Sequence, residues 1–204
     1  MKRIAVLASG NGSNLQALID QLNVPNSPAE ISLVVANVAS AHALTRGREA
    51  GIPTFFVPHE GRGDRQNYEK LLIQLLQEYA IDFVCLAGFM RLLTHRFLDA
   101  YPLRVLNVHP ALLPSFPGTH APLQALKAGV KLSGCTIHLV NEGVDSGPIL
   151  AQAAVPVLEN DDVDSLSARI QNVEHQLYPQ VVRLFAEGRL RTKDNLFFLD
   201  GWSP

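Results

Sequence analysis

An amide and an imidazole stand two residues apart in the stretch NVHPALLPSFPG, residues 107–118. Asn107 and His109 follow the apolar run RVL, and side chains two residues apart on a strand point to the same side. An imidazole transfers protons near neutral pH, and an amide N–H donates to an oxygen that becomes negative. The pair therefore predicts acyl or formyl transfer, with His109 moving the proton and Asn107 stabilising the oxyanion.

A carboxylate is the third member of the predicted catalytic group. Asp145 lies in the turn NEGVDSG, after the apolar run GCTIHLV. A carboxylate beside an imidazole can orient it, raise its pKa by favouring the cation, or hold a water molecule. Taken singly, each of the three residues also suits a structural role in a turn or at a strand end. We expect a shared site because ligands of open α/β sheets bind where the strands end.

The remaining histidines and both cysteines are assigned mostly structural roles. His120 and His175 lie near the predicted site segments and are candidates for supporting roles, whereas His138 lies inside an apolar run and is expected in the core. The motifs G-x-S-x-G, H-E-x-x-H and C-x-x-C are absent, so the sequence favours neither a serine nucleophile nor a metal. Cys85 and Cys135 lie in apolar runs and are predicted to be free buried thiols.

A second candidate site follows the first apolar run, where RIAVLASGNGSNLQALIDQL indicates a strand, a glycine-containing turn and a helix. Gly10 and Gly12 can adopt backbone conformations closed to other residues. Asn11 or Ser13 can cap the helix. Free N–H groups at the start of such a helix bind phosphate without Lys or Arg. An ordinary tight turn is the alternative.

A nucleotide-cofactor protein is the other alternative for this turn. The dinucleotide fingerprint has a third glycine where this chain has Leu15, and an acidic residue after the second strand, where the chain reads VVANVAS. A Walker loop is excluded because no Gly-Lys-Ser/Thr follows the turn. Phosphate binding therefore remains the prediction, and dinucleotide binding is weakened.

The elements that must position these residues alternate along the chain. Strand-like apolar runs without polar alternation recur, and they are RIAVLAS, ISLVVAN, PTFFVP, DFVCLAGF, RVLNVH, GCTIHLV and ILAQAAVPV. Helical patterns separate them, one of which has its apolar face at Leu15, Leu18, Ile19 and Leu22. This alternation predicts a parallel α/β sheet. The tail after residue 188 is expected to form a small appended element.

Length and charge limit the class of partner. The 204 residues suffice for one domain with a sizeable core. A net charge of −2 provides no basic surface for nucleic acid, so small-molecule substrates are expected. No apolar run reaches the length of a signal peptide core or a membrane span, so we expect a cytoplasmic protein. The sequence leaves monomer or homodimer open.

Four stretches, SGNGSNLQALID, LAGFMRLL, NVHPALLPSFPG and GCTIHLVNEGVDSGPIL, resemble in this order the glycinamide ribonucleotide formyltransferase family. The resemblance covers the whole chain and implies a Rossmann-like, mostly parallel sheet of about seven strands flanked by helices. It also implies a single domain, residues 1–204, with two lobes. The N-terminal lobe, about 1–100, would bind nucleotide phosphate, and the C-terminal lobe, about 101–204, would contribute catalytic and folate-binding residues.

The resemblance implies formyl transfer from the co-substrate 10-formyltetrahydrofolate to the amine of glycinamide ribonucleotide in purine biosynthesis, without a metal. Asn107, His109 and Asp145 match the family's catalytic residues. The positions that match contacts to the ribonucleotide are Gly12, Ser13, Asn14, Gly88, Gln171 and Glu174. The positions that match the folate site are Arg65, Met90, Arg91, Leu92, Leu93 and Asn141. Core packing is the alternative for MRLL, and a solvated loop charge is the alternative for Arg65.

The chain departs from the family pattern at one position, and related activities are alternatives to the one implied above. Pro122 stands where many relatives have a histidine, which weakens a role for the loop around His120 in gating or substrate contact. A formyltetrahydrofolate hydrolase and formyltransferases acting on methionyl-tRNA or nucleotide-linked sugars are alternatives, as is, more distantly, a Rossmann-type nucleotide-binding protein. The start of the chain at its first strand, and its end at Pro204 without a basic extension, favour the free-nucleotide enzyme.

Overall fold

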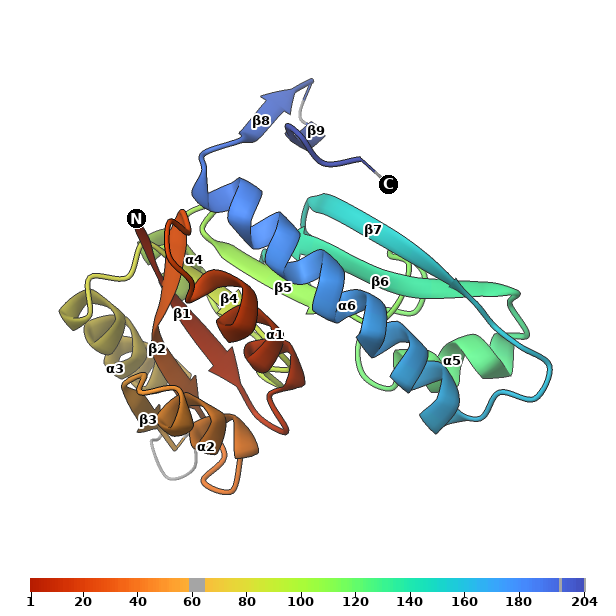
Figure 1. The fold of residues 1–204 in the computed structure, drawn as a ribbon, viewed down its shortest axis with the longest axis horizontal. Helices are drawn as coiled ribbons and strands as arrows, with labels where there is room; N and C mark the ends of the chain where they lie inside the picture. The colour runs from red at the N-terminus through yellow and green to blue at the C-terminus, as the bar shows by residue number, and fades with distance from the viewer. Residues whose placement is uncertain (59–64, 195, 204) are drawn as a thin grey trace. The chain divides into compact units, whose positions relative to one another are not determined.

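The computed structural model describes residues 1–58, 65–194 and 196–203. Seven strands form one mostly parallel sheet in the order β3-β2-β1-β4-β5-β6-β7, and helices flank it (Figure 1). This arrangement confirms the α/β class predicted from the alternating apolar runs and the mostly parallel sheet of about seven strands implied by the family resemblance. By its internal contacts the chain divides into two compact units, Met1–Asn107 and Val108–Pro204.

The first unit alternates strands and helices. Its elements are β1 (Lys2–Ala8), α1 (Ser13–Leu22), β2 (Ala29–Ala36), α2 (His42–Glu49), β3 (Thr54–Phe56), α3 (Arg65–Glu78), β4 (Phe83–Leu86), α4 (His95–Ala100) and β5 (Val105–His109), whose last two residues belong to the second unit. β1 pairs in parallel with β2 and β4, and β4 pairs in parallel with β5. In this register Leu7 lies opposite Leu86, which lies opposite Asn107. The segments that follow β1 and β4 therefore emerge at one edge of this unit.

The core of the first unit explains why its strands lack polar alternation. All residues of β1 from Ile4 to Ala8 are 0% exposed, because a parallel strand is covered on both faces. Helix α1 buries Leu15, Leu18, Ile19 and Leu22, the face that the spacing of three and four residues predicts. Each of these aliphatic side chains contributes roughly 1.5–3 kcal/mol through removal from water.

The second unit is built around an antiparallel hairpin and one long helix. Its elements are α5 (Ala121–Ala128), β6 (Leu132–Leu139), β7 (Ile149–Pro156), α6 (Val163–Ala186), β8 (Leu190–Lys193) and β9 (Leu196–Leu199). β6 and β7 pair antiparallel, and α6 runs along both strands (Figure 1). β8 and β9 form a separate two-stranded sheet, which is the small appended element that the sequence predicts.

Helix α6 begins at a capping box and continues through a proline. Asp162 accepts from the backbone N–H of Ser165, whose hydroxyl in turn accepts from the N–H of Asp162. The helix continues past Pro179, which lies inside it. Cys85 and Cys135 are buried thiols that form no disulfide within the described residues, as predicted. Across the described ranges, no helix has both the length and the apolar character that a membrane span requires.

Candidate functional site

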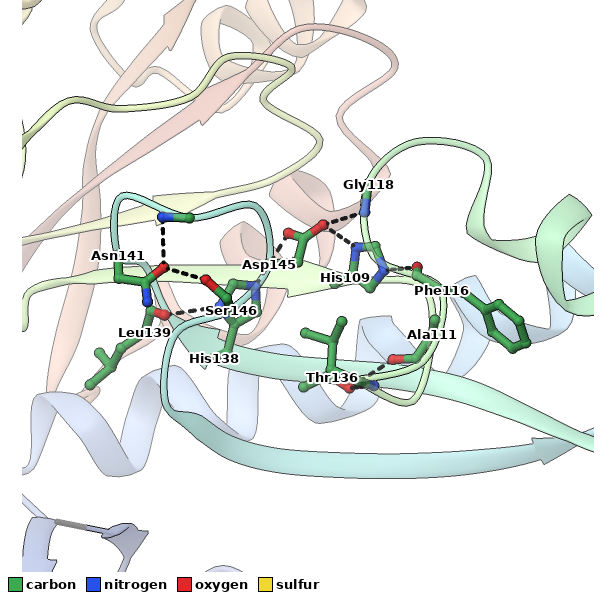
Figure 2. Close-up of polar contacts among 12 residues, drawn as sticks. His109, Ala111, Phe116, Gly118, Thr136, His138, Leu139, Asn141, Asp145 and Ser146 are labelled. Atoms are coloured by element: carbon green, nitrogen blue, oxygen red, sulfur yellow. Dashed lines mark hydrogen bonds and ion pairs between the residues drawn. The ribbon is translucent and has the colours of Figure 1, made fainter.

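His109 is the last residue of β5 and is held at both ring nitrogens. Its side chain is buried, with Nδ1 3.2 Å from Oδ2 of Asp145 and Nε2 2.8 Å from the carbonyl oxygen of Phe116 (Figure 2). Pro110 follows and keeps the backbone of His109 extended. Asn107 lies two residues earlier on the same strand and is partly buried. The structure thus brings His109 into contact with Asp145, a contact that the sequence alone leaves open.

Asp145 is fixed by its turn and by a second loop. Its φ of 45° lies in the left-handed region, which aspartate and asparagine tolerate better than other side chains. Oδ2 also accepts from the N–H of Gly118 at 2.8 Å. Within the same turn, the side-chain oxygen of Asn141 accepts from Gly143 and from Ser146 (Figure 2). Asn141, predicted as a folate contact, therefore also braces the turn that carries Asp145.

His138 contacts the same carboxylate, which the sequence interpretation missed. Nε2 of His138 lies 3.6 Å from Oδ1 of Asp145, and Nδ1 lies 2.9 Å from the carbonyl oxygen of Leu139. Its side chain is buried, as predicted for a core residue, but it also forms part of the site. The available signal was its position near the end of β6, immediately before the turn that contains Asp145.

Burial and polar contacts act in opposite directions on the pKa values of His109 and Asp145. Burial lowers the pKa of His109 below its ordinary value, and the neighbouring His138 adds to this effect. The Phe116 carbonyl and the Asp145 carboxylate act in the opposite direction. The predicted effect of Asp145 therefore has the correct sign, but burial outweighs it and the net direction is downward. Burial raises the pKa of Asp145, yet the contacts from His138, Gly118 and His109 lower it overall, so this residue stays ionised at neutral pH.

Side-chain hydrogen bonds, in addition to the prolines, fix the segment that follows His109. The hydroxyl of Thr136, on β6, donates to the carbonyl oxygen of Ala111 at 2.7 Å and accepts from the N–H of Leu113 at 3.0 Å (Figure 2). The side-chain amide of Gln152 donates to the same hydroxyl and to the carbonyl oxygen of Leu113. Thr136 and Gln152 thus hold the backbone that positions the imidazole, and nothing in the local sequence singled them out.

The glycine turn of the first unit differs in detail from its prediction. Gly12 is the N-cap of α1 with φ 78°, and a Cβ there would lie 2.8 Å from Cα of Ala43. Gly10 has no such positive φ and has open space around its Cα, so only Gly12 uses the conformational freedom of glycine. The prediction that Asn11 or Ser13 caps the helix is wrong, because the described chain contains no side-chain cap at this end of α1. The first N–H groups of the helix are therefore not consumed by a capping side chain.

Ser9 joins this turn to the segment after β4. Its hydroxyl donates to the side-chain oxygen of Asn37 at 2.6 Å and accepts from the N–H of Met90 at 2.9 Å. The N–H of Ser9 donates to the carbonyl oxygen of Gly88 at 3.1 Å. A residue that the sequence interpretation did not select therefore links the predicted phosphate turn to two predicted substrate contacts.

In the predicted folate segment, core packing accounts for Leu93 but not for Met90 and Leu92. Met90 is 69% exposed and Leu92 is 45% exposed, whereas Leu93 is buried. The guanidinium of Arg91 lies over the ring of Tyr68, 4.9 Å from its centre. Exposed apolar side chains beside a charged one suit a surface that receives a flat ligand. The side chain of Arg65, at the start of α3, lies outside the described residues.

The remaining predicted contacts lie on α6 and at the start of α5. Glu174 is buried at 4% exposure, and Gln171, nearly one turn earlier, is exposed. His120, the N-cap of α5, is exposed with φ 59°. Pro122 lies in the first turn of α5, where the missing N–H needs no partner. Among the described residues, no three His, Cys, Asp or Glu side chains are grouped as a metal site requires.

Comparison with known proteins places the chain in a family. A model of the Formyl transferase family matches residues 2–182. Phosphoribosylglycinamide formyltransferase of Escherichia coli K12 is 44% identical over 97% of this chain and 93% of that protein. Human trifunctional purine biosynthetic protein adenosine-3 is 46% identical over 95% of this chain, which spans only 19% of that relative's length.

A solved structure agrees with the sequence comparison. The crystal structure of glycinamide ribonucleotide transformylase 1 from Symbiobacterium toebii has a TM-score of 0.94 and 47% identity. The superposition covers 97% of this chain and 93% of that one. This chain therefore belongs to the formyl transferase family, and within it to the phosphoribosylglycinamide formyltransferases.

Proposed function

We propose that this chain transfers the formyl group of 10-formyltetrahydrofolate to the primary amine of glycinamide ribonucleotide. The products are formylglycinamide ribonucleotide and tetrahydrofolate, in the de novo synthesis of purines. The contact between Asp145 and His109 at the end of β5 is the observation that carries this proposal, because it supplies a buried imidazole with a charged partner. Membership in the formyl transferase family supports the same reaction class.

Formyl transfer needs one group that stabilises the developing oxyanion and one group that carries a proton. The lone pair of the amine attacks the formyl carbon, a C–N bond forms, and the formyl oxygen becomes an oxyanion. Asn107 donates its amide N–H to this oxyanion, a contact that strengthens as the charge develops. When the intermediate collapses, the bond to N10 of the folate breaks and N10 takes up a proton. The amine loses one proton in the same cycle, so the proton balance closes.

His109 carries this proton. Because its pKa is lowered, the neutral imidazole is available near neutral pH to accept a proton from the attacking amine. The resulting imidazolium is stabilised by Asp145 and then donates to N10. Asp145 holds Nδ1, so Nε2 exchanges its contact with the Phe116 carbonyl for one with the substrate. Proton transfer of this kind contributes about 10²–10⁴-fold to the rate.

The substrates are small molecules bound by residues of both lobes. The N–H groups at the start of α1, where there is no side-chain cap, bind the ribonucleotide phosphate, which needs no lysine in the turn. The residues assigned to the ribonucleotide are Gly12, Ser13, Asn14, Gly88, Gln171 and Glu174. The residues assigned to the folate are Arg65, Met90, Arg91, Leu92, Leu93 and Asn141. On this assignment the N-terminal lobe, about 1–100, carries the phosphate-binding turn and most of the folate positions, and the C-terminal lobe, about 101–204, carries the catalytic residues and the folate position Asn141.

A turnover assay of the purified protein tests this proposal. Tetrahydrofolate release from 10-formyltetrahydrofolate is followed by absorbance, with and without glycinamide ribonucleotide, and the formylated product is identified by mass spectrometry. We expect release that requires the ribonucleotide and stops in His109→Ala. Equal release without the ribonucleotide would identify a hydrolase instead. No release with either substrate mixture would contradict formyl transfer to this acceptor.

A further inference from the structure

Arg46 of α2 donates hydrogen bonds to the glycine turn that precedes α1. Its Nε donates to the carbonyl oxygen of Asn11 at 3.0 Å, and its Nη2 donates to Oδ1 of the same residue at 3.0 Å. Its Nη1 donates to the side-chain oxygen of Gln16 at 3.2 Å, one turn into α1. One guanidinium therefore fixes the backbone and side chain of Asn11 and the first part of the helix.

The partners of Arg46 are all neutral oxygens within the described part of the chain. The nearby carboxylate of Asp20 accepts from the amide of Gln16 at 2.8 Å, not from the guanidinium. The positive charge of Arg46 is thus not neutralised by a carboxylate contact. It lies next to helix N–H groups that already favour an anion.

Helix α2 also approaches the turn through its backbone. The N–H of Ala43 donates to the carbonyl oxygen of Gly10 at 3.2 Å. Gly12 packs so closely on Ala43 that a Cβ would lie within 2.9 Å of two of its atoms. The turn is therefore held by α2 at three successive residues, Gly10, Asn11 and Gly12.

We propose that Arg46 is a positioning residue for the phosphate of the ribonucleotide. It fixes Asn11 so that the following N–H groups keep one arrangement, and its uncompensated charge favours the phosphate dianion. The proposal rests on the proposed function, which assigns the phosphate to this turn. It adds a residue from a different helix, which acts through Asn11 and Gln16 rather than by touching the phosphate.

Three variants separate this role from a general effect of charge on α2. Arg46→Met removes the hydrogen bonds and the charge, while Arg46→Lys keeps the charge and loses the planar fork. Arg48→Met is the matched control, because Arg48 belongs to the same last turn of α2 and has an exposed side chain. Isothermal calorimetry with ribose 5-phosphate measures phosphate binding without any turnover.

We expect Arg46→Met to weaken ribose 5-phosphate binding about tenfold at low salt, with a smaller difference at high salt because the charge is then screened. Arg46→Lys should fall between this variant and the wild type, and Arg48→Met should bind like the wild type. In turnover, Arg46→Met should raise KM for the ribonucleotide while kcat and KM for the folate stay within about twofold.

The outcomes are distinguishable from failure of the proposed function. Wild-type affinity in Arg46→Met overturns the inference, even if the wild type transfers formyl groups normally. Wild-type affinity in Arg46→Lys overturns the positioning role and leaves only a charge effect. Equal weakening in Arg48→Met overturns the assignment to this side chain. A wild type whose binding of ribose 5-phosphate depends on Arg46, but which does not formylate the ribonucleotide, contradicts the proposed function alone.

Discussion

Oδ2 of Asp145 lies 3.2 Å from Nδ1 of His109, in a turn where Asp145 itself adopts a left-handed backbone conformation. The other ring nitrogen faces the carbonyl oxygen of Phe116, so both nitrogens meet acceptors. These contacts favour the imidazolium, and burial of the ring opposes it. The proton affinity of His109 is therefore set by neighbours that can be replaced one at a time.

Loss of either partner should remove catalysis and preserve the fold. His109→Ala and Asp145→Asn should lower kcat by about 10²–10⁴-fold, because the proton path or its charged partner is lost. Asparagine is chosen at 145 because it tolerates the left-handed backbone that alanine would strain. Initial rates at saturating substrates measure the effect, and thermal denaturation checks that the variants fold. Near-normal turnover in a folded variant would refute the assigned role.

Titration of the His109 ring tests the electrostatic account directly. Burial places its pKa below the ordinary value of about 6.5. Asp145→Asn removes a negative charge that raises this pKa, so the pKa should fall further. His138→Gln removes a neighbour whose electrostatic interaction lowers it, so the pKa of His109 should rise. NMR titration of the ring Cε1 resonance, assigned by its loss in His109→Ala, measures both shifts; movement of the two variants in the same direction would contradict this account.

We expect glycine to be required at only one position of the turn that is predicted to bind phosphate. Gly12→Ala should destabilise the protein by more than about 1–2 kcal/mol, because its left-handed backbone disfavours a Cβ and Ala43 occupies the space. Gly10→Ala is the matched control, because no heavy atom lies within 4 Å of the added methyl group. Urea denaturation of both variants measures the difference. Equal stability of Gly12→Ala and Gly10→Ala would show that the close approach of α2 is not needed.

Loss of the Ser9 hydroxyl should weaken the binding of both substrates. Ser9→Ala removes the acceptor of the Met90 N–H and the donor to Asn37, so the segments predicted to bind ribonucleotide and folate both lose a tether. We expect KM to rise several-fold for both substrates, whereas Ser13→Ala should raise KM for the ribonucleotide alone. Steady-state kinetics with each substrate varied in turn makes the comparison. An increase confined to one substrate in Ser9→Ala would argue against the link.

Local patterns were sufficient to predict the elements of the fold. β1 reads as an unbroken apolar run because both faces of a parallel strand are covered, and α1 reads as a helix because its leucines recur at three and four residues. The end of β5 could be placed because Pro110 restricts the residue before it. These signals depend only on neighbours in the sequence.

The features of the site that the sequence did not predict depend on contacts between segments that are far apart in the chain. Arg46 is 35 residues from Asn11, and Met90 is 81 residues from Ser9, so no local spacing reports either hydrogen bond. His138 carries the sequence signature of a buried strand residue, which it is, and burial conceals its second role. The net direction of the His109 pKa also escaped prediction, because it depends on how completely the folded chain removes the ring from water.

The hairpin of β6 and β7 closes a much shorter loop of chain than the pairing of β1 with β4. Its innermost paired residues are His138 and Ile149, whereas the pairing of β1 with β4 joins Ile4 to Phe83. Closing the shorter loop costs about 2 kcal/mol less chain entropy. His138 and Asp145 both lie in the segment that this hairpin closes, so the contact between their side chains can form within one contiguous piece of chain. The hydrogen bonds that join Ser9 to Gly88 and Met90 instead form only after β1 has paired with the more distant β4.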